Sequence, residues 1–459
     1  MKKMTVLALG LAVAACTQPQ ELPDNVMVTG TNPIITNQFT ADPTARVFNG
    51  RIYMFPSHDI PSVITHTDGS AWFSMADYHV FSSEDLTTWT DHGVIVRQED
   101  VPWGKPDAYS MWAPDCVEKD GKYYFYFPNT SRNGGFAVGV AIADSPEGPY
   151  EILPEPIEGI HGIDPCVLQA SDGNAYIFWG NGRCAKLKEN MTELADDNPK
   201  ETVKWGPFEM EMVGVNCLQG LPNRQAEGPF AFEYDGNFYL TYPYVREDTE
   251  VLAYAMSKNP MGPYEYKGII MAEHENGCWT NHHSIVNYKG QWYLFYHHNA
   301  FSPDFDKNRS AQIERLYFNP DGTIREVKPT MRGVGPVKAS HKVHIDRYSH
   351  IEGAAIEYLD TTDYFKGWKT VFAQAGDKAR FNELDFGRKA PRKMVLRVRS
   401  SVPSELTITA GKTGDVQVPE CPEWTEIELP MPFRTKGMQD LEIALASGNN
   451  IEIDWVSFK

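Results

Sequence analysis

A repeated pair of strand-like segments constrains the fold of this chain more than any other feature of its sequence. Each copy has a short apolar stretch, a turn that contains glycine, and a second stretch rich in aromatic residues. Five copies occur, at residues 47–55, 116–126, 166–178, 230–240 and 284–295. Asn-Gly and Asp-Gly pairs between apolar stretches predict β-hairpins, because both central residues of such a tight turn need a positive φ.

Further strand-like segments follow these hairpins, for example at 78–82, 136–141 and 251–255. No stretch with helical periodicity separates one copy from the next, and four strands per copy are typical of blades around an axis. We therefore predict an all-β fold, with a five-bladed β-propeller at residues 30–335. An irregular β-sandwich is the alternative, but the spacing of the repeats favours the propeller.

Ionisable residues stand just before the first strand of each copy. They are Asp42, Asp115, Asp164, Glu227 and, before the fifth copy, His282 and His283. The first strand of a propeller blade lines the axis, so residues at equivalent entry points converge at one end of it. Carboxylates that lie close together raise one another's pKa, which acid–base catalysis near neutral pH requires. One Asp-Pro pair is better explained as a turn, but several at equivalent positions predict an active site.

These segments resemble glycoside hydrolase family 43 over roughly residues 30–335. The resemblance rests on Ala41-Asp42-Pro43, Trp112-Ala113-Pro114-Asp115, Gly162-Ile163-Asp164-Pro165, Ala226-Glu227-Gly228-Pro229, His282-His283-Ser284 and Arg309. It implies a five-bladed propeller that hydrolyses glycosidic bonds with inversion. It also implies that Asp42 is the general base, that Glu227 is the general acid, and that Asp164 tunes the pKa of the acid and orients it.

The same resemblance implies further site residues. Arg309, Asp115 and His283 would contact the substrate, and Trp112 would form a wall of the sugar site unless it only packs between blades. His282 matches a histidine that lies near an axial metal ion in relatives, usually calcium. Calcium prefers oxygen ligands, so a hydrogen-bonding role is the alternative for His282. The chemistry itself requires no cofactor.

Residues 341–459 lack the blade repeat and alternate as the strands of a β-sandwich do. Segments at 351–353, 375–381 and 448–455 resemble carbohydrate-binding module family 6, a jelly roll. The resemblance implies that Glu352 and Asp454 hold a structural calcium ion. Lys378 and Glu452 stand where an aromatic residue and an asparagine often line the sugar cleft of that family. A domain that only packs on the propeller is therefore the alternative.

The first residues predict export. Lys2 and Lys3 precede an apolar run, so residues 1–15 are expected to be a signal peptide. Val13-Ala14-Ala15-Cys16 resembles a bacterial lipobox, which implies an acylated Cys16 and a tether at 16–29. We expect a bacterial lipoprotein of the outer membrane, on its periplasmic side or at the cell surface, that contacts the membrane only through this anchor.

Charge and cysteine spacing exclude some functions. The formal net charge is −19, which disfavours nucleic acid but not a neutral polysaccharide. The six cysteines after Cys16 show no Cys-x-x-Cys spacing, and no His/Cys cluster along the sequence argues for zinc. Pairing among these cysteines stays open. We expect a monomer whose partner is a plant-type polysaccharide or oligosaccharide.

The main functional hypothesis is an exo-acting, inverting α-L-arabinofuranosidase that acts on arabinoxylan or arabinan fragments. β-D-Xylosidase activity with the same carboxylates is the first alternative, and a non-catalytic glycan-binding propeller is the second. A retaining fructan hydrolase on a similar propeller is disfavoured, because Asp42 lies between Ala41 and Pro43 rather than in an Asn-Asp-Pro-Asn segment.

Overall fold

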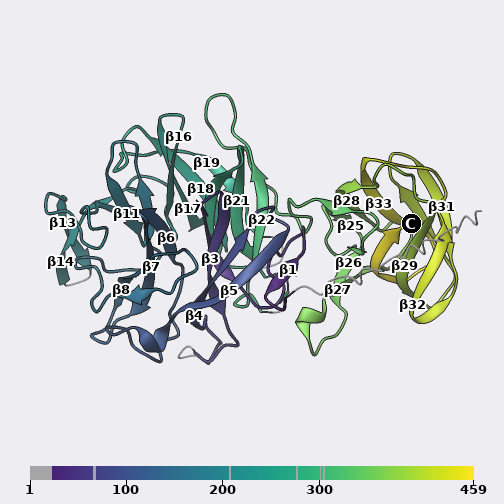
Figure 1. The fold of residues 1–459 in the computed structure, drawn as a ribbon, viewed down its shortest axis with the longest axis horizontal. Helices are drawn as coiled ribbons and strands as arrows, with labels where there is room; N and C mark the ends of the chain where they lie inside the picture. Colours follow the sequence, from purple (N-terminus) through teal and green to yellow (C-terminus); the bar gives the residue numbers. More distant parts are fainter. Residues whose placement is uncertain (1–22, 66–68, 206–207, 275–277, 300, 303–304) are drawn as a thin grey trace, which may run out of the picture.

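The computed structural model describes residues 23–65, 69–205, 208–274, 278–299, 301–302 and 305–459. Over these residues the regular structure consists of β-strands and two short 3-10 helices, η1 (Gln98–Asp100) and η2 (Tyr364–Lys366). Figure 1 shows two bodies side by side, a larger one made by the first two thirds of the chain and a smaller one at its C-terminal end. The expected signal peptide and Cys16 lie outside the described residues. Within those residues, a search for a helix long and apolar enough to cross a bilayer finds none.

Five antiparallel sheets, blades one to five, form the larger body. Blade one contains β2 (Ala41–Phe48), β3 (Arg51–Asp59), β4 (Met75–Ser83) and β5 (Thr88–Arg97), with β1 (Val26–Val28) on its outer edge. Blade two contains β6 (Asp115–Lys119), β7 (Lys122–Thr130), β8 (Phe136–Ala143) and β9 (Glu151–Ile152). Blade three contains β10 (Cys166–Gln169), β11 (Ala175–Trp179), β12 (Arg183–Lys186) and β15 (Val215–Asn216), with a separate hairpin of β13 (Lys200–Trp205) and β14 (Phe208–Val213). Blade four contains β16 (Phe230–Tyr234), β17 (Asn237–Val245), β18 (Glu250–Ser257) and β19 (Glu265–Met271). Blade five contains β20 (His283–Tyr288), β21 (Gln291–His298) and β22 (Ser310–Leu316).

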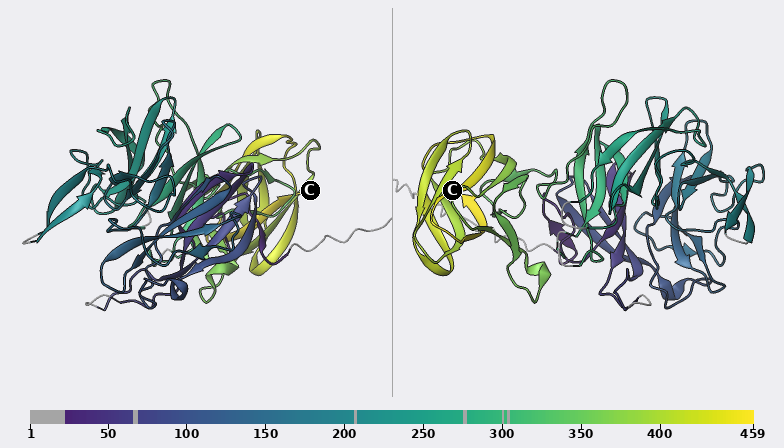
Figure 2. Two further views of the ribbon diagram at one scale, coloured as in Figure 1. Left: turned by 60° about the vertical axis from the view of Figure 1, so that its left-hand side comes forward. Right: turned by 180° about the vertical axis from the view of Figure 1, so that it is seen from behind.

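The first strands of the blades form a closed ring. β2 contacts β6 and β20, β10 contacts β6 and β16, and β16 contacts β20. The two views of Figure 2 show the blades arranged around this centre. The structure therefore confirms the prediction of a five-bladed propeller.

Tight turns join the first two strands of four blades as expected. Asn49-Gly50, Asp120-Gly121, Asp235-Gly236 and Lys289-Gly290 all have positive φ at both residues. The third copy differs, because its strands end at Gln169 and resume at Ala175. Asp172-Gly173 therefore lies in a longer loop, in which only the glycine has a positive φ.

Residues near the N-terminus close the ring against blade five. The Ile34 N–H donates to the Ala311 carbonyl at 3.0 Å, and the Ile313 N–H donates to Asn32 Oδ1 at 2.9 Å. Blade five thus has three strands of its own, where we expected four strands. The segment at residues 32–34 pairs with its outermost strand, β22, in place of a fourth strand. The strand β1 lies within 16–29, the expected tether, so the propeller begins earlier than residue 30.

Aromatic side chains fill the space between blades. Tyr78 of blade one and Phe125 of blade two are fully buried, with ring centroids 5.1 Å apart. Burial of one such side chain stabilises the fold by roughly 1.5–3 kcal/mol. The aromatic-rich second strand of each repeat thus holds neighbouring blades together and fixes the positions of the loops at the axis.

Two six-stranded sheets form the smaller body, which we call the C-terminal sandwich (residues 337–458). One sheet contains β23 (Val337–Lys338), β25 (His350–Glu352), β28 (Lys378–Asp385), β30 (Ser404–Thr409), β31 (Thr413–Val418) and β33 (Met438–Ser447). The other contains β24 (Val343–His344), β26 (Ala355–Tyr358), β27 (Trp368–Phe372), β29 (Lys393–Ser400), β32 (Cys421–Pro430) and β34 (Ile451–Phe458). Alternate side chains of both sheets point inward and make one apolar core, as the sequence pattern predicted.

The two bodies pack directly on each other. Phe39 and Phe301 of the propeller form an apolar cluster with Trp368 of the sandwich. Arg347 Nη1 donates to the Asn32 carbonyl at 2.8 Å. Phe39 precedes Asp42 by three residues, so the sandwich supports the segment that leads into the first blade.

Candidate active site

A cavity of about 190 Å³ lies where the inner strands of the propeller begin. Its lining consists of Asp42, Trp72, Phe73, Met75, Trp112, Ala113, Ile163, Asp164, Glu227, Trp279, Thr280, His282 and Arg309. The structure therefore brings Asp42, Asp164 and Glu227 together with Trp112, His282 and Arg309. A larger hollow of about 410 Å³ lies on the outer strands of blade two, where Asp144 pairs with Lys122, and it has no such convergence of acids.

Unusual backbone conformations aim the acids into this cavity. Asp42 has φ 48° and Asp164 has φ 57°, in the left-handed region that costs a non-glycine residue about 1–3 kcal/mol. Gly228, next to Glu227, has φ 52°, and a Cβ there would lie 2.8 Å from His282 Nδ1. A glycine is therefore required at position 228 for the backbone beside Glu227 to pack against His282. Strain of this kind at Asp42 and Asp164 indicates that the side-chain directions serve chemistry.

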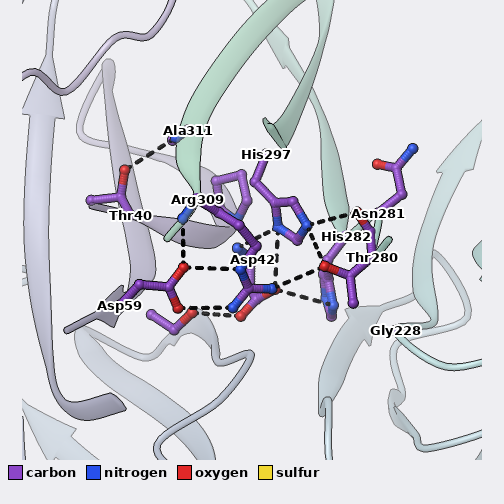
Figure 3. A network of polar contacts seen from close by, with 12 residues as sticks. Thr40, Asp42, Asp59, Gly228, Thr280, Asn281, His282, His297, Arg309 and Ala311 are labelled. Carbon is purple, nitrogen blue, oxygen red and sulfur yellow. Dashed lines mark hydrogen bonds and ion pairs between the residues drawn. The ribbon is translucent and has the colours of Figure 1, made fainter. Parts of the chain in front are cut away.

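Asp42 lies at the centre of a buried network (Figure 3). Its Oδ1 atom lies 3.2 Å from Arg309 Nη1, and its Oδ2 atom accepts a hydrogen bond from the Ser57 hydroxyl. The Asp42 N–H donates to His297 Nδ1 at 3.1 Å. His297 Nε2 lies 3.1 Å from the Thr280 carbonyl, to which it donates. His297 is thus the neutral Nε2–H tautomer and acts as an acceptor toward Asp42.

The Arg309 guanidinium sets the charge of Asp42. Burial raises the pKa of the Asp42 carboxyl, but the positive charge of Arg309, together with the contacts of His297 and His282, more than offsets burial and holds the pKa well below its usual range. Asp42 is therefore ionised at any pH near neutrality. An ionised carboxylate has lone pairs beyond those used here, so it can accept a proton from water.

Asp59 is a site residue that sequence reasoning missed. Its carboxylate accepts hydrogen bonds from Arg309 Nε and Nη2, each at 2.9 Å, and from the Arg309 N–H at 2.8 Å. Both side chains are almost fully buried, and paired contacts of this kind fix the plane of a guanidinium. Asp59 thus positions Arg309 beside Asp42. Asp59 ends the strand β3, and no repeat of the sequence marks it.

Glu227 has the opposite protonation tendency. Burial and the negative charge of Asp42 raise the pKa of Glu227 from 4.5 to about 7, although Arg309 opposes this. Glu227 thus retains a proton near neutral pH while Asp42 does not. Two acids whose surroundings separate their pKa values in this way can serve as an acid and a base.

Asp164 contacts the segment that carries Glu227. Its Oδ2 atom accepts the Gly228 N–H at 3.1 Å, which fixes the peptide that follows Glu227. Burial and the charge of Glu227 raise the pKa of Asp164 well above its usual range. Asp164 and Glu227 therefore titrate as a pair. The contact with Gly228 supports the orienting role that the family resemblance implied.

Aromatic side chains make the walls of the cavity. Trp112 lines the cavity and also packs against Phe136, with ring centroids 5.1 Å apart. Phe73 lies under Arg309, whose guanidinium carbon is 4.7 Å from the ring centroid. Apolar rings around a few convergent polar groups are typical of sites for small ligands and can cover the face of a sugar ring.

Asp115 and His283 lie outside the cavity, contrary to the expectation that they contact substrate. Asp115 is fully buried and pairs with Arg46 Nη2 at 2.6 Å, while its Oδ2 atom also accepts the Val167 N–H. His283 is fully buried, with Nε2 2.5 Å from Thr241 Oγ1. Asp115 links three inner strands, and His283 links β20 to β17 of the neighbouring blade, so the contacts of both side chains are structural.

The surroundings of His282 do not fit a calcium cage. His282 Nδ1 lies 3.9 Å from Asp42 Oδ1, and that carboxylate already contacts Arg309. Calcium takes six to eight oxygen ligands. Among the described residues, no group of three His, Cys, Asp or Glu ligand atoms includes His282. The hydrogen-bonding alternative for His282 agrees better with these contacts, and burial lowers its pKa to about 4.

The structure also fails to support calcium at Glu352 and Asp454 of the C-terminal sandwich. Glu352 is exposed and pairs with Lys378 Nζ at 2.9 Å. Asp454 is buried and pairs with Arg397 and His344. Positive side chains of the protein thus occupy the places where a cation was expected.

The six described cysteines, Cys116, Cys166, Cys184, Cys217, Cys278 and Cys421, are all free and buried. Among the residues that the structure describes they form no disulfide bonds. Stability of this part of the chain therefore rests on packing and hydrogen bonds rather than on covalent cross-links.

Comparison with known proteins identifies relatives of the whole propeller. A model of the family "Glycosyl hydrolases family 43" matches residues 30–324. Xylosidase/arabinosidase 43A of Humicola insolens is 37% identical over 335 residues, which cover 65% of this chain and 99% of that protein. The crystal structure of CoXyl43, a β-xylosidase/α-arabinofuranosidase from a compost microbial metagenome, is 33% identical with a TM-score of 0.57, and covers 66% of this chain and 99% of that one.

One relative extends into the C-terminal sandwich. Arabinoxylan arabinofuranohydrolase of Paenibacillus polymyxa is 26% identical over 502 aligned residues. The alignment covers 97% of this chain and 76% of that protein. Similarity along the chain therefore includes both bodies.

Proposed function

The chain belongs to glycosyl hydrolases family 43 and is a glycoside hydrolase, and from this premise we propose that it is an exo-acting, inverting α-L-arabinofuranosidase. Its substrates are arabinose-decorated xylan or arabinan fragments. The observation that carries the proposal is the pairing, in one cavity, of an ionised Asp42 with a Glu227 that keeps its proton.

Inverting hydrolysis requires one proton transfer to the glycosidic oxygen and one proton transfer away from the attacking water. Glu227 donates its proton to the glycosidic oxygen, so the leaving group departs as a neutral alcohol. Asp42 accepts a proton from a water molecule, whose oxygen attacks the anomeric carbon from the opposite face of the sugar. Asp164 holds the Gly228 peptide and thereby the direction of Glu227. Arg309 and Asp59 hold the carboxylate of Asp42.

The size of the cavity supports action at chain ends. Its volume of about 190 Å³ is below the ~300–1,000 Å³ of pockets for drug-sized ligands. The space suits one sugar residue rather than the middle of a polysaccharide. Because the inner strands begin around it and the axis below holds the Arg46–Asp115 pair, a sugar enters from one side only.

We favour arabinofuranose as the sugar because of the relative that aligns with nearly the whole chain. The relative that covers 97% of the chain is named as an arabinoxylan arabinofuranohydrolase. β-D-Xylosidase activity is the second candidate, because two relatives with 37% and 33% identity are named for both activities and one with 35% identity is named as a β-xylosidase. The three acids serve either reaction, so the walls of the cavity make the choice.

Product analysis tests the proposal. The purified protein is incubated with arabinoxylan, arabinan fragments and xylo-oligosaccharides, and the released sugars are separated by chromatography. Proton NMR of the first product distinguishes inversion from retention. Release of arabinose from the arabinosylated substrates supports the proposal, xylose alone supports the second candidate, and binding without release of any sugar supports a non-catalytic propeller.

We also propose that Cys16 is acylated after export, on the basis of its lipobox-like setting. A lipoprotein partitions into detergent and takes up labelled palmitate in growing bacteria. A Cys16→Ser variant should lose both properties and appear in the soluble fraction. Retention of the label by that variant would place the lipid elsewhere.

A further inference from the structure

Blade one carries a second cluster of ionisable side chains that the glycosidase site does not use. His58 of β3 and Asp77 of β4 approach within 2.7 Å, from His58 Nδ1 to Asp77 Oδ1. His79 Nε2 lies 4.0 Å from the same oxygen. One ligand atom of each residue lies within 4.8 Å of the others, and this is the one such group found among the described residues. The three side chains are 15–20% exposed, so a solvent ligand can reach them.

A fourth residue orients the cluster. Asp91 of β5 accepts from His79 Nδ1, with its two oxygens at 3.0 and 3.1 Å. An ionised carboxylate only accepts hydrogen bonds, so Nδ1 carries the proton and the Nε2 lone pair faces Asp77. Asp91 also accepts the Gly93 N–H at 2.8 Å, which fixes its position. A carboxylate behind a histidine is the arrangement that fixes and strengthens a histidine ligand in metal sites.

Charge favours a cation between these side chains. Asp77 and Asp91 are carboxylates, which carry a negative charge at neutral pH, and each contacts a histidine. Arg97 also contacts the group, since its Nη1 lies 4.0 Å from Asp77 Oδ2, and its side chain is half exposed. With neutral imidazoles, the group has a net charge of about −1, which a divalent cation would reverse.

We propose that His58, Asp77 and His79 bind a divalent transition-metal ion of the zinc type, with water as the fourth ligand. The ion would replace the proton that His58 Nδ1 donates to Asp77, and that proton would leave to solvent. Two imidazoles and one carboxylate match zinc rather than calcium or magnesium, which prefer oxygen ligands. Ligand atoms about 2.0–2.1 Å from a tetrahedral zinc ion lie about 3.4 Å from one another. The observed separations of 2.7 and 4.0 Å lie on either side of that value.

The spacing of these residues along the sequence does not indicate a metal site. The zinc patterns sought in the sequence are short and rich in cysteine, whereas His58 and Asp77 are 19 positions apart. The pairing of β3 with β4 brings them together. Asp77 and His79 then point to the same face of β4, because alternate residues of a strand do.

The ion would act on structure rather than on the sugar. Ser57 and Asp59 flank His58 on β3, and they hold Asp42 and Arg309 respectively. A metal bond from His58 to β4 would tie down the end of β3 that carries both contacts. The consequence is greater stability of blade one near the active site. Metal binding can be measured without substrate, so this inference and the proposed glycosidase activity can fail separately.

Titration of the metal-stripped full-length protein with zinc chloride tests the proposal by calorimetry, together with the melting temperature. One site should bind zinc, and binding should raise the melting temperature. His58→Gln and His79→Gln should each weaken zinc binding at least tenfold. Asp91→Asn keeps all three ligands and should weaken it about 10–100-fold, as loss of a residue behind a histidine ligand does. His350→Gln, at an exposed histidine of the C-terminal sandwich, is the matched control and should bind as the wild type does.

Cobalt(II) gives a second readout that does not depend on stability. Cobalt held in a tetrahedral site absorbs visible light, and this absorption should appear in the wild type and vanish in His79→Gln. Circular dichroism verifies that each variant is folded, and Asp91→Asn decides the matter if a ligand variant fails to fold. No zinc binding by the wild type, or unchanged binding in the folded variants, would overturn the proposal, since zinc would then be absent or held by other groups such as His282.

Discussion

Arg309 contacts Asp42 through a single nitrogen, Nη1, and directs its other side-chain donors mainly to Asp59. The arrangement keeps Asp42 ionised without surrounding it. A carboxylate bonded on all sides would be a poor base, because a water molecule could not approach its lone pairs. The division of Arg309 between two acids thus explains how Asp42 can be both buried and reactive.

Asp42→Asn should lower kcat by about 10²–10⁴-fold, the usual contribution of a general base. Asparagine tolerates the left-handed backbone of Asp42, so the fold should survive. Nitrophenyl arabinofuranoside hydrolysis and circular dichroism measure the two properties. A variant that keeps wild-type kcat would remove Asp42 from the mechanism.

Glu227→Gln should impair natural substrates more than activated ones. The leaving sugar alcohol needs the proton of Glu227, whereas nitrophenolate leaves readily without it. The loss of kcat/KM should therefore be about 10²–10⁴-fold on arabino-oligosaccharides and clearly smaller on the nitrophenyl glycoside. Equal losses on both substrates would contradict the role of Glu227 as the acid.

Activity should fall as pH rises through about 7, because Glu227 must keep its proton and its pKa is about 7. No acid limb due to Asp42 should appear near pH 4, since Arg309 holds the pKa of that base well below its usual range. A profile of kcat/KM against pH in the range where the protein stays folded measures both limbs. Activity that rises through neutral pH would reverse the assignment of the two acids.

Asp59→Asn should introduce an acid limb. Asparagine at position 59 lacks the negative charge that holds the Arg309 guanidinium in place. Arg309 then spends less time beside Asp42, so the pKa of Asp42 rises toward its ordinary value. We expect kcat/KM to fall about 10–100-fold, within the effect of a small misplacement at an active site. Asp107→Asn, at an exposed acid paired with Lys105, serves as the control and should leave the pH profile unchanged. A loss of stability with an unaltered profile would leave Asp59 only a packing role.

Asp115→Asn should reduce stability and spare catalysis. The substitution leaves Arg46 partly unpaired on the axis, and breaking a buried ion pair costs about 3–5 kcal/mol. Urea unfolding measures that cost, and kcat/KM per folded molecule should stay near the wild-type value. Asp144→Asn, in the exposed pair with Lys122, should change stability by about 0.5 kcal/mol or less. If Asp115 instead touched the sugar, KM would rise in the folded variant.

The repeat allowed the fold and the convergence of Asp42, Asp164 and Glu227 to be predicted. It did not show which of the acids before the repeats point into the cavity. Asp42, Asp115 and Asp164 occupy the same place in their repeats, yet the backbones of Asp42 and Asp164 have positive φ whereas Asp115 starts its strand without it. The side chain of Asp115 therefore turns toward Arg46 rather than into the cavity. A single sequence does not reveal this difference in φ, because aspartate adopts either conformation.

Residues whose roles depend on strand pairing could not be found from the sequence. Asp59 meets Arg309 across 250 positions of the chain, and no repeat marks it. The calcium ligands expected at Glu352 and Asp454 failed for a similar reason. Their neighbours Lys378 and Arg397 come from adjacent strands, which only the register of the sheets brings within reach.

Closure of the ring by its own beginning has a consequence for how the protein is made. Asn32 completes its hydrogen bonds with Ile313 and Thr330, 281 and 298 positions later, so the propeller cannot shut until nearly all of its blades have been synthesised. Contacts between such distant positions make folding slow and leave strand edges open in the meantime. A chain of this design therefore locks into its closed ring only after its last blade has been made.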